Sequence, residues 1–438
     1  MKRAVLFATT YWGAYAPGGA EWTNAAWAQA LTRRGHRVIV VTPNYGDVAR
    51  DEQDGLVVVR QAFPLGAFRH EAGRQREAPW LLHRNPLFHG WLARHIRRVA
   101  RAEGAELVHA QSDGAIVAAS RAARALGLPF VATVRDLGVL CPLGMCPIVE
   151  PRATYDCSRR DYVERCVPYF LANYARGDGW LRRARRRLAL RLAWRDHAAQ
   201  RRAFSAADLV IGVSRGILRI VPPTLVDPRR MRVVHSPLPR PEGPLEDPVA
   251  VRARLGIGPG PLMLYAGKRS PGKGTEVLIE ALDAIRAAAP GVRFAFAGKG
   301  ELTPPPRADV HVLGSVPQPT LFALYGAADV VVVPSVWPEP LSRVLIEAMY
   351  FGRAIVATRV GGSPELVEDG VTGLLVEPRD PAAIARAVVA LLRDPARRAR
   401  LGAAAAQRVA SELDEERRVA TLLDAYESVL ADAPRSRA

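Results

Sequence analysis

Two carboxylates, Glu339 and Glu347, are separated by seven residues and stand on either side of Ser342 and Arg343. A carboxylate accepts charge-assisted hydrogen bonds, and neighbouring hydroxyls of a sugar can supply them. Backbone amides at the start of a helix bind anions such as a diphosphate. Two carboxylates beside such amides therefore suit a nucleotide diphospho-sugar. The alternative is that each is an ordinary acid on a helix, which is individually common.

The residues around this pair predict the elements that present it. A buried strand is expected over 329–333 and a helix over 341–351, with Pro340 suited to the first helical position. Glu339 would then lie at the mouth of a cleft, and Glu347 about two turns into the helix. The amides near the helix start would point into the same space.

A loop rich in glycine and lysine follows another expected strand, over 263–266. Lys268 and Lys273 lie in this loop, where glycines would let the backbone approach a phosphate that the lysines neutralise. The spacing differs from that of a P-loop. A second loop carries Lys299 between two glycines, and a plain turn explains it as well as a ligand contact does. The chain has only four lysines, so three of them in these loops favour a role in binding.

Buried strands alternate with helices along the whole chain, which predicts an α/β fold with parallel sheets. At 438 residues the chain is long enough for two domains of about 200 residues each. The proline-rich segment 235–248 is interpreted as the linker between them. We expect an N-terminal Rossmann-like domain over 1–240 with an insertion at 137–170, a C-terminal Rossmann-like domain over 241–415, and a C-terminal helix and tail over 416–438 that packs back on the first domain.

The motifs of the C-terminal half resemble glycosyltransferase family 4, and the N-terminal half resembles it loosely. They are the spacing of Glu339 and Glu347, the segments 265–268, 354–358, 361–365 and 373–376, the pair Lys273 and Gly274, and Gly314 before the helix at Leu321. The resemblance is dense over residues 262–378. It implies a retaining enzyme with the glycosyltransferase-B fold, in which two Rossmann-like domains face each other across a cleft and the C-terminal one holds the donor.

The resemblance also implies a role for individual residues. Glu347 would bind the hydroxyls of the ribose, and Glu339 those of the donor sugar. Lys268 and Lys273 would hold the diphosphate and stabilise the leaving group, and backbone around Leu313 would recognise the base. The resemblance also implies that the turn of Gly18 and Gly19 closes over the diphosphate. From the residues themselves, Leu341, Ser342, Arg343 and Lys299 complete the expected substrate-binding set.

Three positions depart from the family pattern. Lys268 stands where the family usually has Arg, so the charge is kept and the two-pronged hydrogen-bonding geometry is lost. Leu341 and Ser342 stand where Phe-Gly is usual. Arg135 stands where a His often precedes Asp136 near the reacting carbon, and Arg cannot act as a base. Arg135 and Asp136 remain the catalytic candidates of the N-terminal domain. The sequence has no Asp-x-Asp with hydrophobic flanks, so no cofactor is expected for catalysis.

All four cysteines, Cys141, Cys146, Cys157 and Cys166, lie within one segment of 26 residues. Four thiolates could hold a structural zinc ion or an iron–sulfur centre. None forms a Cys-x-x-Cys pair, so two disulfides or four reduced thiols remain open as alternatives. The cluster lies in the expected insertion, and the resemblance to family members with a similar insertion implies that it shapes the acceptor side.

A strongly basic helix is expected over 181–202, where nine arginines and one acid are interleaved with apolar residues. Such a helix can lie on anionic membrane, with Trp180, Leu188, Leu192 and Trp194 inserting among the headgroups. The alternative is a solvated helix with one stripe packed on the first domain. The formal net charge of +18 also favours anionic partners, although abundant arginine can reflect genomic base composition.

No apolar run reaches the roughly 20 residues that span a bilayer. The first residues resemble a strand and its glycine turn more than a signal peptide, so a cytoplasmic protein is expected, with peripheral contact at the inner membrane face. The expected function is transfer of a sugar from a nucleotide-sugar donor to a glycan or lipid-linked acceptor, in cell-surface polysaccharide or glycolipid synthesis. Two alternatives stay open: a sugar-nucleotide epimerase on the same fold, and a non-catalytic basic protein that binds nucleic acid. No aromatic–basic motif supports nucleic acid as a partner.

Overall fold

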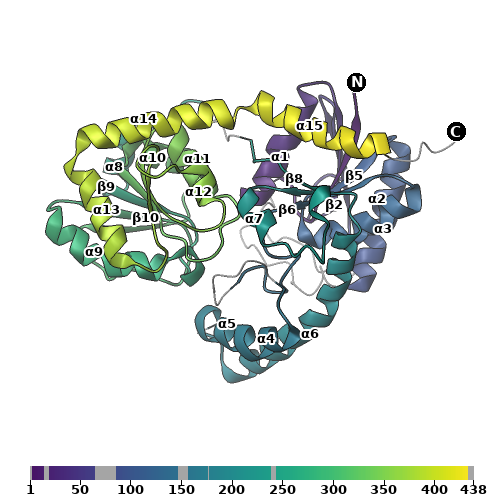
Figure 1. Cartoon of the computed structure of the whole chain (residues 1–438), viewed down its shortest axis with the longest axis horizontal. Helices are drawn as coiled ribbons and strands as arrows, with labels where there is room; N and C mark the ends of the chain where they lie inside the picture. The colour runs from purple at the N-terminus through teal and green to yellow at the C-terminus, as the bar shows by residue number, and fades with distance from the viewer. Residues whose placement is uncertain are drawn as a thin grey trace.

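The computed structural model describes residues 2–13, 19–64, 85–146, 156–175, 177–237 and 243–432. These residues build two mainly parallel sheets, each covered by helices, and the two resulting domains lie side by side (Figure 1). The predicted α/β fold with two Rossmann-like domains is therefore confirmed.

The N-terminal domain contains an eight-stranded sheet in the order β3-β4-β2-β1-β5-β6-β7-β8. Its strands are β1 (Ala4–Ala8), β2 (Arg37–Pro43), β3 (Arg50–Gln53), β4 (Leu56–Gln61), β5 (Leu107–Ala110), β6 (Phe130–Val134), β7 (Leu209–Gly212) and β8 (Met231–Val233). The central strands are runs of buried apolar residues, typical of a parallel sheet covered on both faces. Strand β3 is antiparallel, and its charged and polar residues are exposed, which disfavours pairing of this edge with another chain.

Helices cover both faces of this sheet. They are α1 (Gly19–Thr32), α2 (Pro86–Ala102), α3 (Ile116–Leu126) and α7 (Arg215–Arg219), with short 3-10 turns η3 (Asp113–Ala115) and η5 (Pro228–Arg230). Helix α2 is absent from the elements expected from the sequence, although its start carries two signals. Asn85 caps it by accepting a hydrogen bond from the N–H of Leu87, and Pro86 occupies the first turn.

Between β6 and β7 the chain leaves the sheet and forms a helical insertion. It contains α4 (Arg159–Asp161), a π-helical turn η4 (Tyr162–Cys166), α5 (Val167–Tyr174) and the long helix α6 (Trp180–Ser205). A small core of its own holds the insertion together, made of Leu143, Tyr162, Val167, Leu171 and Ala175. In Figure 1 the insertion projects away from both sheets at the lower edge of the molecule.

The C-terminal domain contains a six-stranded parallel sheet in the order β11-β10-β9-β12-β13-β14. Its strands are β9 (Leu262–Ala266), β10 (Arg293–Ala297), β11 (Val310–Gly314), β12 (Val330–Val333), β13 (Ala354–Thr358) and β14 (Leu374–Val376). Its helices are α8 (Pro248–Arg254), η6 (Pro271–Lys273), α9 (Thr275–Ala288), α10 (Gln318–Ala327), α11 (Arg343–Tyr350), α12 (Ser363–Leu366), α13 (Pro381–Arg393) and α14 (Pro395–Glu412).

This strand order places a topological switch point between β9 and β12. From β9 the chain proceeds outward to β10 and β11, and it then returns to begin β12 on the other side of β9. The loops that follow β9 and β12 therefore meet at the carboxyl edge of the sheet, which is where open α/β sheets bind ligands. These two loops are the ones that carry Lys273 and Glu339.

The last helix, α15 (Glu415–Asp432), returns to the N-terminal domain. It continues from α14 along the upper edge of the molecule in Figure 1. Its residues Val419, Leu422 and Tyr426 are buried in the same apolar cluster as Val5 and Phe7 of β1. The C-terminal end of the chain therefore contributes to the core of the first domain. No helix among the described ranges is both long and apolar enough to cross a membrane.

Two expectations about the helix that carries Glu347 are wrong in detail. Helix α11 begins at Arg343 and not at Pro340, because the Ser342 hydroxyl accepts a hydrogen bond from the N–H of Leu345 and caps the helix there. Glu347 is the fifth residue of α11, so it lies about one turn from the helix start and not two.

Candidate functional site

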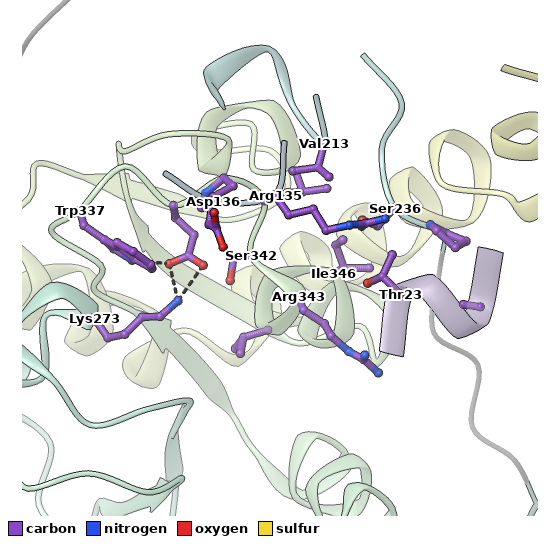
Figure 2. Close-up of a pocket in the computed structure, with 16 residues that line it drawn as sticks. Thr23, Arg135, Asp136, Val213, Ser236, Lys273, Trp337, Ser342, Arg343 and Ile346 are labelled. Atoms are coloured by element: carbon purple, nitrogen blue, oxygen red, sulfur yellow. Dashed lines mark hydrogen bonds and ion pairs between the residues drawn. The ribbon is translucent and has the colours of Figure 1, made fainter. Parts of the chain in front are cut away.

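A cavity of about 430 Å³ lies between the two domains, at the carboxyl ends of their strands (Figure 2). The N-terminal domain lines it with Thr23, Arg135, Asp136 and Ser236, among others. The C-terminal domain lines it with Lys273, Trp337 and the segment from Glu339 through the first turn of α11. The carboxylate and the helix start that were singled out in the sequence therefore face one cavity.

Glu339 is buried in this cavity wall and is surrounded by hydrogen-bond donors. Lys273 Nζ lies 2.7 and 2.6 Å from its two carboxylate oxygens. Trp337 Nε1 donates to it at 2.8 Å and Ser335 Oγ at 3.1 Å. Burial pushes the pKa of Glu339 upward, but these partners outweigh it and hold the pKa below its ordinary value. Glu339 is therefore an ionised carboxylate at neutral pH, paired with a lysine.

Glu347 has a different environment one turn into α11. Its carboxylate accepts hydrogen bonds from Arg343 Nε at 2.6 Å and from Tyr325 Oη at 3.0 Å. Burial raises the pKa of Glu347, and the opposing effect of Arg343 and Tyr325 does not cancel it. Sequence reasoning missed Tyr325, because a tyrosine in the apolar helix α10 gives no signal of its function.

The glycine and lysine loop brings Lys273 to the cavity, but not Lys268. Lys268 and Lys299 are exposed and do not belong to the cavity lining. Gly274, next to Lys273, has a φ of +70°, and a Cβ there would lie 1.8 Å from the carbonyl oxygen of Pro334. Only glycine allows this close approach, which brings the Lys273 loop against the segment that carries Glu339.

Arg269 is a residue that sequence reasoning missed in the same loop. It is buried, and its guanidinium donates to the carbonyl oxygens of Gly298 at 3.1 Å and Leu302 at 2.8 Å. Its backbone N–H also donates to Lys299 O at 2.7 Å. Arg269 therefore ties the two glycine loops together and has a structural role.

On the N-terminal side, Arg135 is held by a buried polar network. Its Nη2 donates to Gln111 Oε1 at 2.6 Å, and Gln111 Nε2 lies 3.1 Å from His109 Nδ1. The same His109 nitrogen lies 2.7 Å from the hydroxyl of Tyr426 in α15. Burial lowers the pKa of His109 well below its ordinary value, so the ring is neutral. The position of Arg135 therefore depends on the helix at the other end of the chain.

Asp136 follows Arg135 and lines the same cavity. Its Oδ1 accepts a hydrogen bond from the N–H of Gly138 at 2.7 Å, which fixes the turn after β6. Figure 2 shows Asp136 between Trp337 and Arg135, whereas the Arg135 side chain extends away from Trp337 toward Ser236. Both catalytic candidates of the first domain thus line the cavity that also contains Glu339 of the second.

The two domains touch beside the cavity. The Ser214 hydroxyl donates a hydrogen bond to the carbonyl oxygen of Pro340. The Glu365 carboxylate accepts hydrogen bonds from the backbone N–H groups of Arg215 at 2.9 Å and Gly216 at 2.6 Å. Leu341 packs against the cores of both domains. These contacts hold the start of α11 against the first domain.

The remaining candidates lie farther out. Gly18 is outside the described residues, and Gly19 is the first residue of α1. Leu313 is half-buried near the end of β11, and the next residue, Gly314, accepts a hydrogen bond from the N–H of Gly298 at 2.6 Å. Leu313 does not belong to the lining of the cavity.

The four cysteines are all half-buried. Cys141 and Cys166 pack against the core of the insertion, and Cys146 packs against the core of the N-terminal domain. Burial raises the pKa of Cys141 to about 12, and the thiols of Cys166, Cys157 and Cys146 add to the shift. The thiols are therefore near enough to interact. Within the part of the chain that the structure describes, no three His, Cys, Asp or Glu side chains form a group arranged to hold a metal.

Metal binding by the cysteines stays a prediction. A bound metal would displace the thiol protons and draw the sulfurs together, so it would reverse the unfavourable burial of Cys141. We expect elemental analysis of anaerobically purified protein to find about one zinc ion or one iron centre per chain. Exchanging Cys141 and Cys166 for Ser should abolish the signal. A metal-free protein that is folded and active would refute this prediction.

The fold and the site together define a glycosyltransferase of the glycosyltransferase-B type. Residues 17–239 match the family model described as Glycosyltransferase Family 4, and residues 260–394 match the model described as Glycosyl transferases group 1. The first of these models spans half of the chain, and the chain belongs to glycosyltransferase family 4. Among the three functional classes left open by the sequence, this membership selects the enzyme that transfers a sugar from a nucleotide-sugar donor.

Individual relatives agree with this assignment. The chain is 28% identical over 400 residues to alpha-maltose-1-phosphate synthase of Mycolicibacterium smegmatis. The aligned region covers 83% of this chain and 90% of that protein. Other curated relatives match over 38% to 46% of this chain and about half of their own length, between 42% and 51%.

Solved structures show the same fold over nearly the whole chain. Sucrose-phosphate synthase from Thermosynechococcus elongatus superposes with a TM-score of 0.68 at 20% identity, covering 98% of this chain and 100% of that one. HepE from Anabaena in complex with UDP superposes with a TM-score of 0.64 at 21% identity, with the same coverage.

Proposed function

We propose that the cavity between the domains binds a uridine diphospho-sugar and transfers its sugar with retention of anomeric configuration. The observation that carries the proposal is the ion pair of Lys273 and Glu339 beside the N-terminus of α11, with Glu347 one turn inside that helix. A cation and a set of helix amides suit a diphosphate, and carboxylates on either side suit a ribose and a sugar. The choice of uridine is supported by HepE, whose structures contain UDP, UDP with glucose, and UDP-glucose.

Each residue of the site receives a role in this proposal. Lys273 and the amides near Ser342 hold the diphosphate, and Lys273 stabilises it as the leaving group. Glu347 accepts hydrogen bonds from the hydroxyls of the ribose. Glu339 orients the sugar, and Lys273 keeps its carboxylate ionised. Lys268 and Lys299 are exposed and Leu313 is half-buried, and in this proposal they contact the part of the nucleotide that extends beyond the cavity.

The acceptor side belongs to Arg135 and Asp136. Arg135 cannot take a proton from an acceptor hydroxyl, but its anchored guanidinium can hold an anionic or hydroxylated group of the acceptor. A retaining reaction on one face of the sugar requires no nucleophile from the enzyme, so the absence of a histidine here is compatible with transfer.

A thermal-shift screen tests the proposed donor. Ligand that binds the folded state raises its stability by about 2.7 kcal/mol at 100 times the dissociation constant. UDP-sugars should therefore raise the melting temperature more than ADP-, GDP- or dTDP-sugars, and free sugars should have no effect. Stabilisation by another nucleotide would overturn the choice of uridine, and no stabilisation by any of them would overturn the proposed site.

For the acceptor, we propose a glycan or lipid-linked molecule at an anionic membrane surface, in the synthesis of cell-surface polysaccharide or glycolipid. The support comes from α6, where Trp180 is 77% exposed, Leu188 60% and Leu192 50%. Leu181 and Leu188 lie seven residues apart on one helix face, and arginines surround them. Trp194 differs, because it packs on Tyr162 in the core of the insertion. The membrane-facing part is therefore the first half of α6.

Replacing two exposed arginines of α6, Arg185 and Arg187, by Gln is expected to reduce binding to vesicles that contain anionic lipid. The attraction is electrostatic, so binding of the unmodified protein should weaken as salt shortens the Debye length from about 10 Å at 0.1 M. Vesicle flotation measures both effects. The matched control replaces Arg386 and Arg400, two exposed arginines of the C-terminal domain, and should leave flotation unchanged. Absence of flotation at low salt would show that α6 is structural.

A further inference from the structure

We propose that Tyr174, in the helical insertion of the N-terminal domain, is a positioning residue for the loop that presents Lys273 to the donor. The inference rests on the proposed donor site and adds a residue that lies outside the cavity lining. Its basis is one hydrogen bond between domains, in which the backbone N–H of Gly272 donates to Tyr174 Oη at 3.0 Å. The two residues are 98 positions apart in the chain.

Gly272 is the point at which three parts of the protein meet. Its N–H donates to Tyr174, and its carbonyl oxygen accepts hydrogen bonds from the N–H groups of Val336 at 3.0 Å and Trp337 at 3.2 Å. The next residue is Lys273, whose ammonium reaches Glu339 and lies 5.0 Å from the centre of the Trp337 ring. The bond from Tyr174 therefore acts on the backbone directly before the lysine that holds the diphosphate.

Tyr174 is supported rigidly enough to position this loop. Its ring stacks on Phe170, with centroids 5.2 Å apart and an interplanar angle of 14°. Both lie on α5, which is anchored by Val167 and Leu171 in the core of the insertion. Burial raises the pKa of Tyr174 to about 12, against the opposing effect of the Gly272 bond, so the hydroxyl is neutral at pH 7. A neutral hydroxyl on a fixed helix keeps one geometry over the working pH range.

The contact leaves little room on either side. A Cβ built on Gly272 would lie 3.2 Å from Tyr174 Oη and 3.7 Å from the Trp337 side chain. The Gly272→Ala substitution should therefore push against the tyrosine hydroxyl. The Tyr174→Phe substitution removes that oxygen and should also remove the obstacle. The two single variants and the double variant form a double-mutant cycle. If both substitutions act on the contact between Tyr174 and Gly272, their effects should not be additive.

We expect an effect on catalysis because binding of free UDP and stabilisation of the leaving group place different demands on Lys273. Free UDP can bind to Lys273, Glu347 and the α11 amides, which all belong to the C-terminal domain. Stabilising the leaving group requires Lys273 to be positioned while the two domains enclose the sugar, and the Tyr174 bond joins the two domains directly beside Lys273. Loss of the bond should therefore reduce turnover more than affinity for UDP.

The test measures Tyr174→Phe, Gly272→Ala and the double variant in the full-length protein. Tyr174→Phe should lower kcat with UDP-glucose by about three- to tenfold, the range for one lost neutral hydrogen bond, and change the dissociation constant for UDP less than about twofold. Gly272→Ala should lower both kcat and the melting temperature in the unmodified protein. In the Tyr174→Phe background the same substitution should lower these two values only slightly further. Tyr169→Phe, at the exposed end of the same helix, is the matched control and should leave all values unchanged.

An unchanged kcat in Tyr174→Phe, equal losses of kcat and UDP affinity, or melting temperatures that simply add in the double variant would each overturn the proposal. The melting temperatures need no ligand, so they separate this proposal from the proposed function. If the unmodified protein neither binds UDP nor turns over UDP-glucose, the assigned donor fails, while non-additive melting temperatures would still establish the contact between Tyr174 and Gly272.

Discussion

Replacing Glu339 by Gln is expected to lower turnover about 10- to 100-fold, the range for loss of a charge-assisted contact from a buried site, while affinity for free UDP changes less than about threefold. The Glu339 carboxylate balances Lys273 and accepts hydrogen bonds from Trp337 and Ser335. A glutamine keeps the shape but cannot match the lysine charge. Lys273 then remains available for the diphosphate, whereas the sugar loses its charged acceptor.

The comparison of intact donor with free UDP decides this prediction. Initial rates with UDP-glucose give kcat, and calorimetric titration with UDP gives the dissociation constant. Glu280→Gln, an exposed glutamate on α9, is the matched control and should resemble the unmodified protein. Equal losses for UDP and for turnover would mean that Glu339 acts on the nucleotide and not on the sugar.

The second large effect is expected on binding of the nucleotide. Lys273→Ala and Glu347→Ala should each weaken affinity for UDP by about 1–3 kcal/mol, or about 5- to 150-fold, because each removes a charged partner from a buried site. Lys273 lines the cavity, and Glu347 is buried one turn into α11, next to the cavity lining that the first turn of this helix supplies.

Calorimetric titration measures this loss, and two further variants make it specific. Lys2→Ala removes an exposed lysine of the N-terminal domain and should leave affinity unchanged. Glu347→Gln keeps a partner for Tyr325 and limits disruption of the core around Arg343, so its melting temperature should lie closer to that of the unmodified protein. Unchanged affinity in both alanine variants would remove Lys273 and Glu347 from the donor site.

Much of the fold could be predicted because it depends on local patterns. The buried runs that became β1, β9, β12 and β13 are continuous apolar segments, and a parallel sheet covered on both faces requires such segments. Helix α2 was missed although Asn85 and Pro86 mark its start. Edge strands β3 and β8 were missed because exposed or short strands carry little hydrophobic signal.

The start of α11 shows the limit of local rules. Proline is common in the first turn of a helix, and Pro340 satisfied that rule in the sequence. The helix instead starts after Ser342, whose hydroxyl caps it, while the carbonyl of Pro340 accepts a hydrogen bond from Ser214 of the other domain. A contact with a distant residue thus decided between two local signals.

By itself, the sequence determined the class of fold, the family and the pairing of Glu339 with Glu347 around a helix start. These depend on spacings of fewer than about ten residues, which the geometry of a strand followed by a helix converts directly into position. Tertiary structure alone decided that Lys273, and not Lys268 or Lys299, reaches the cavity. It also decided that Arg135 is held through Gln111 and His109 by α15, and that Tyr174 contacts Gly272. Such partners are separated by up to 317 residues, and contacts over that separation arise from packing of whole domains, which no local pattern of residues encodes.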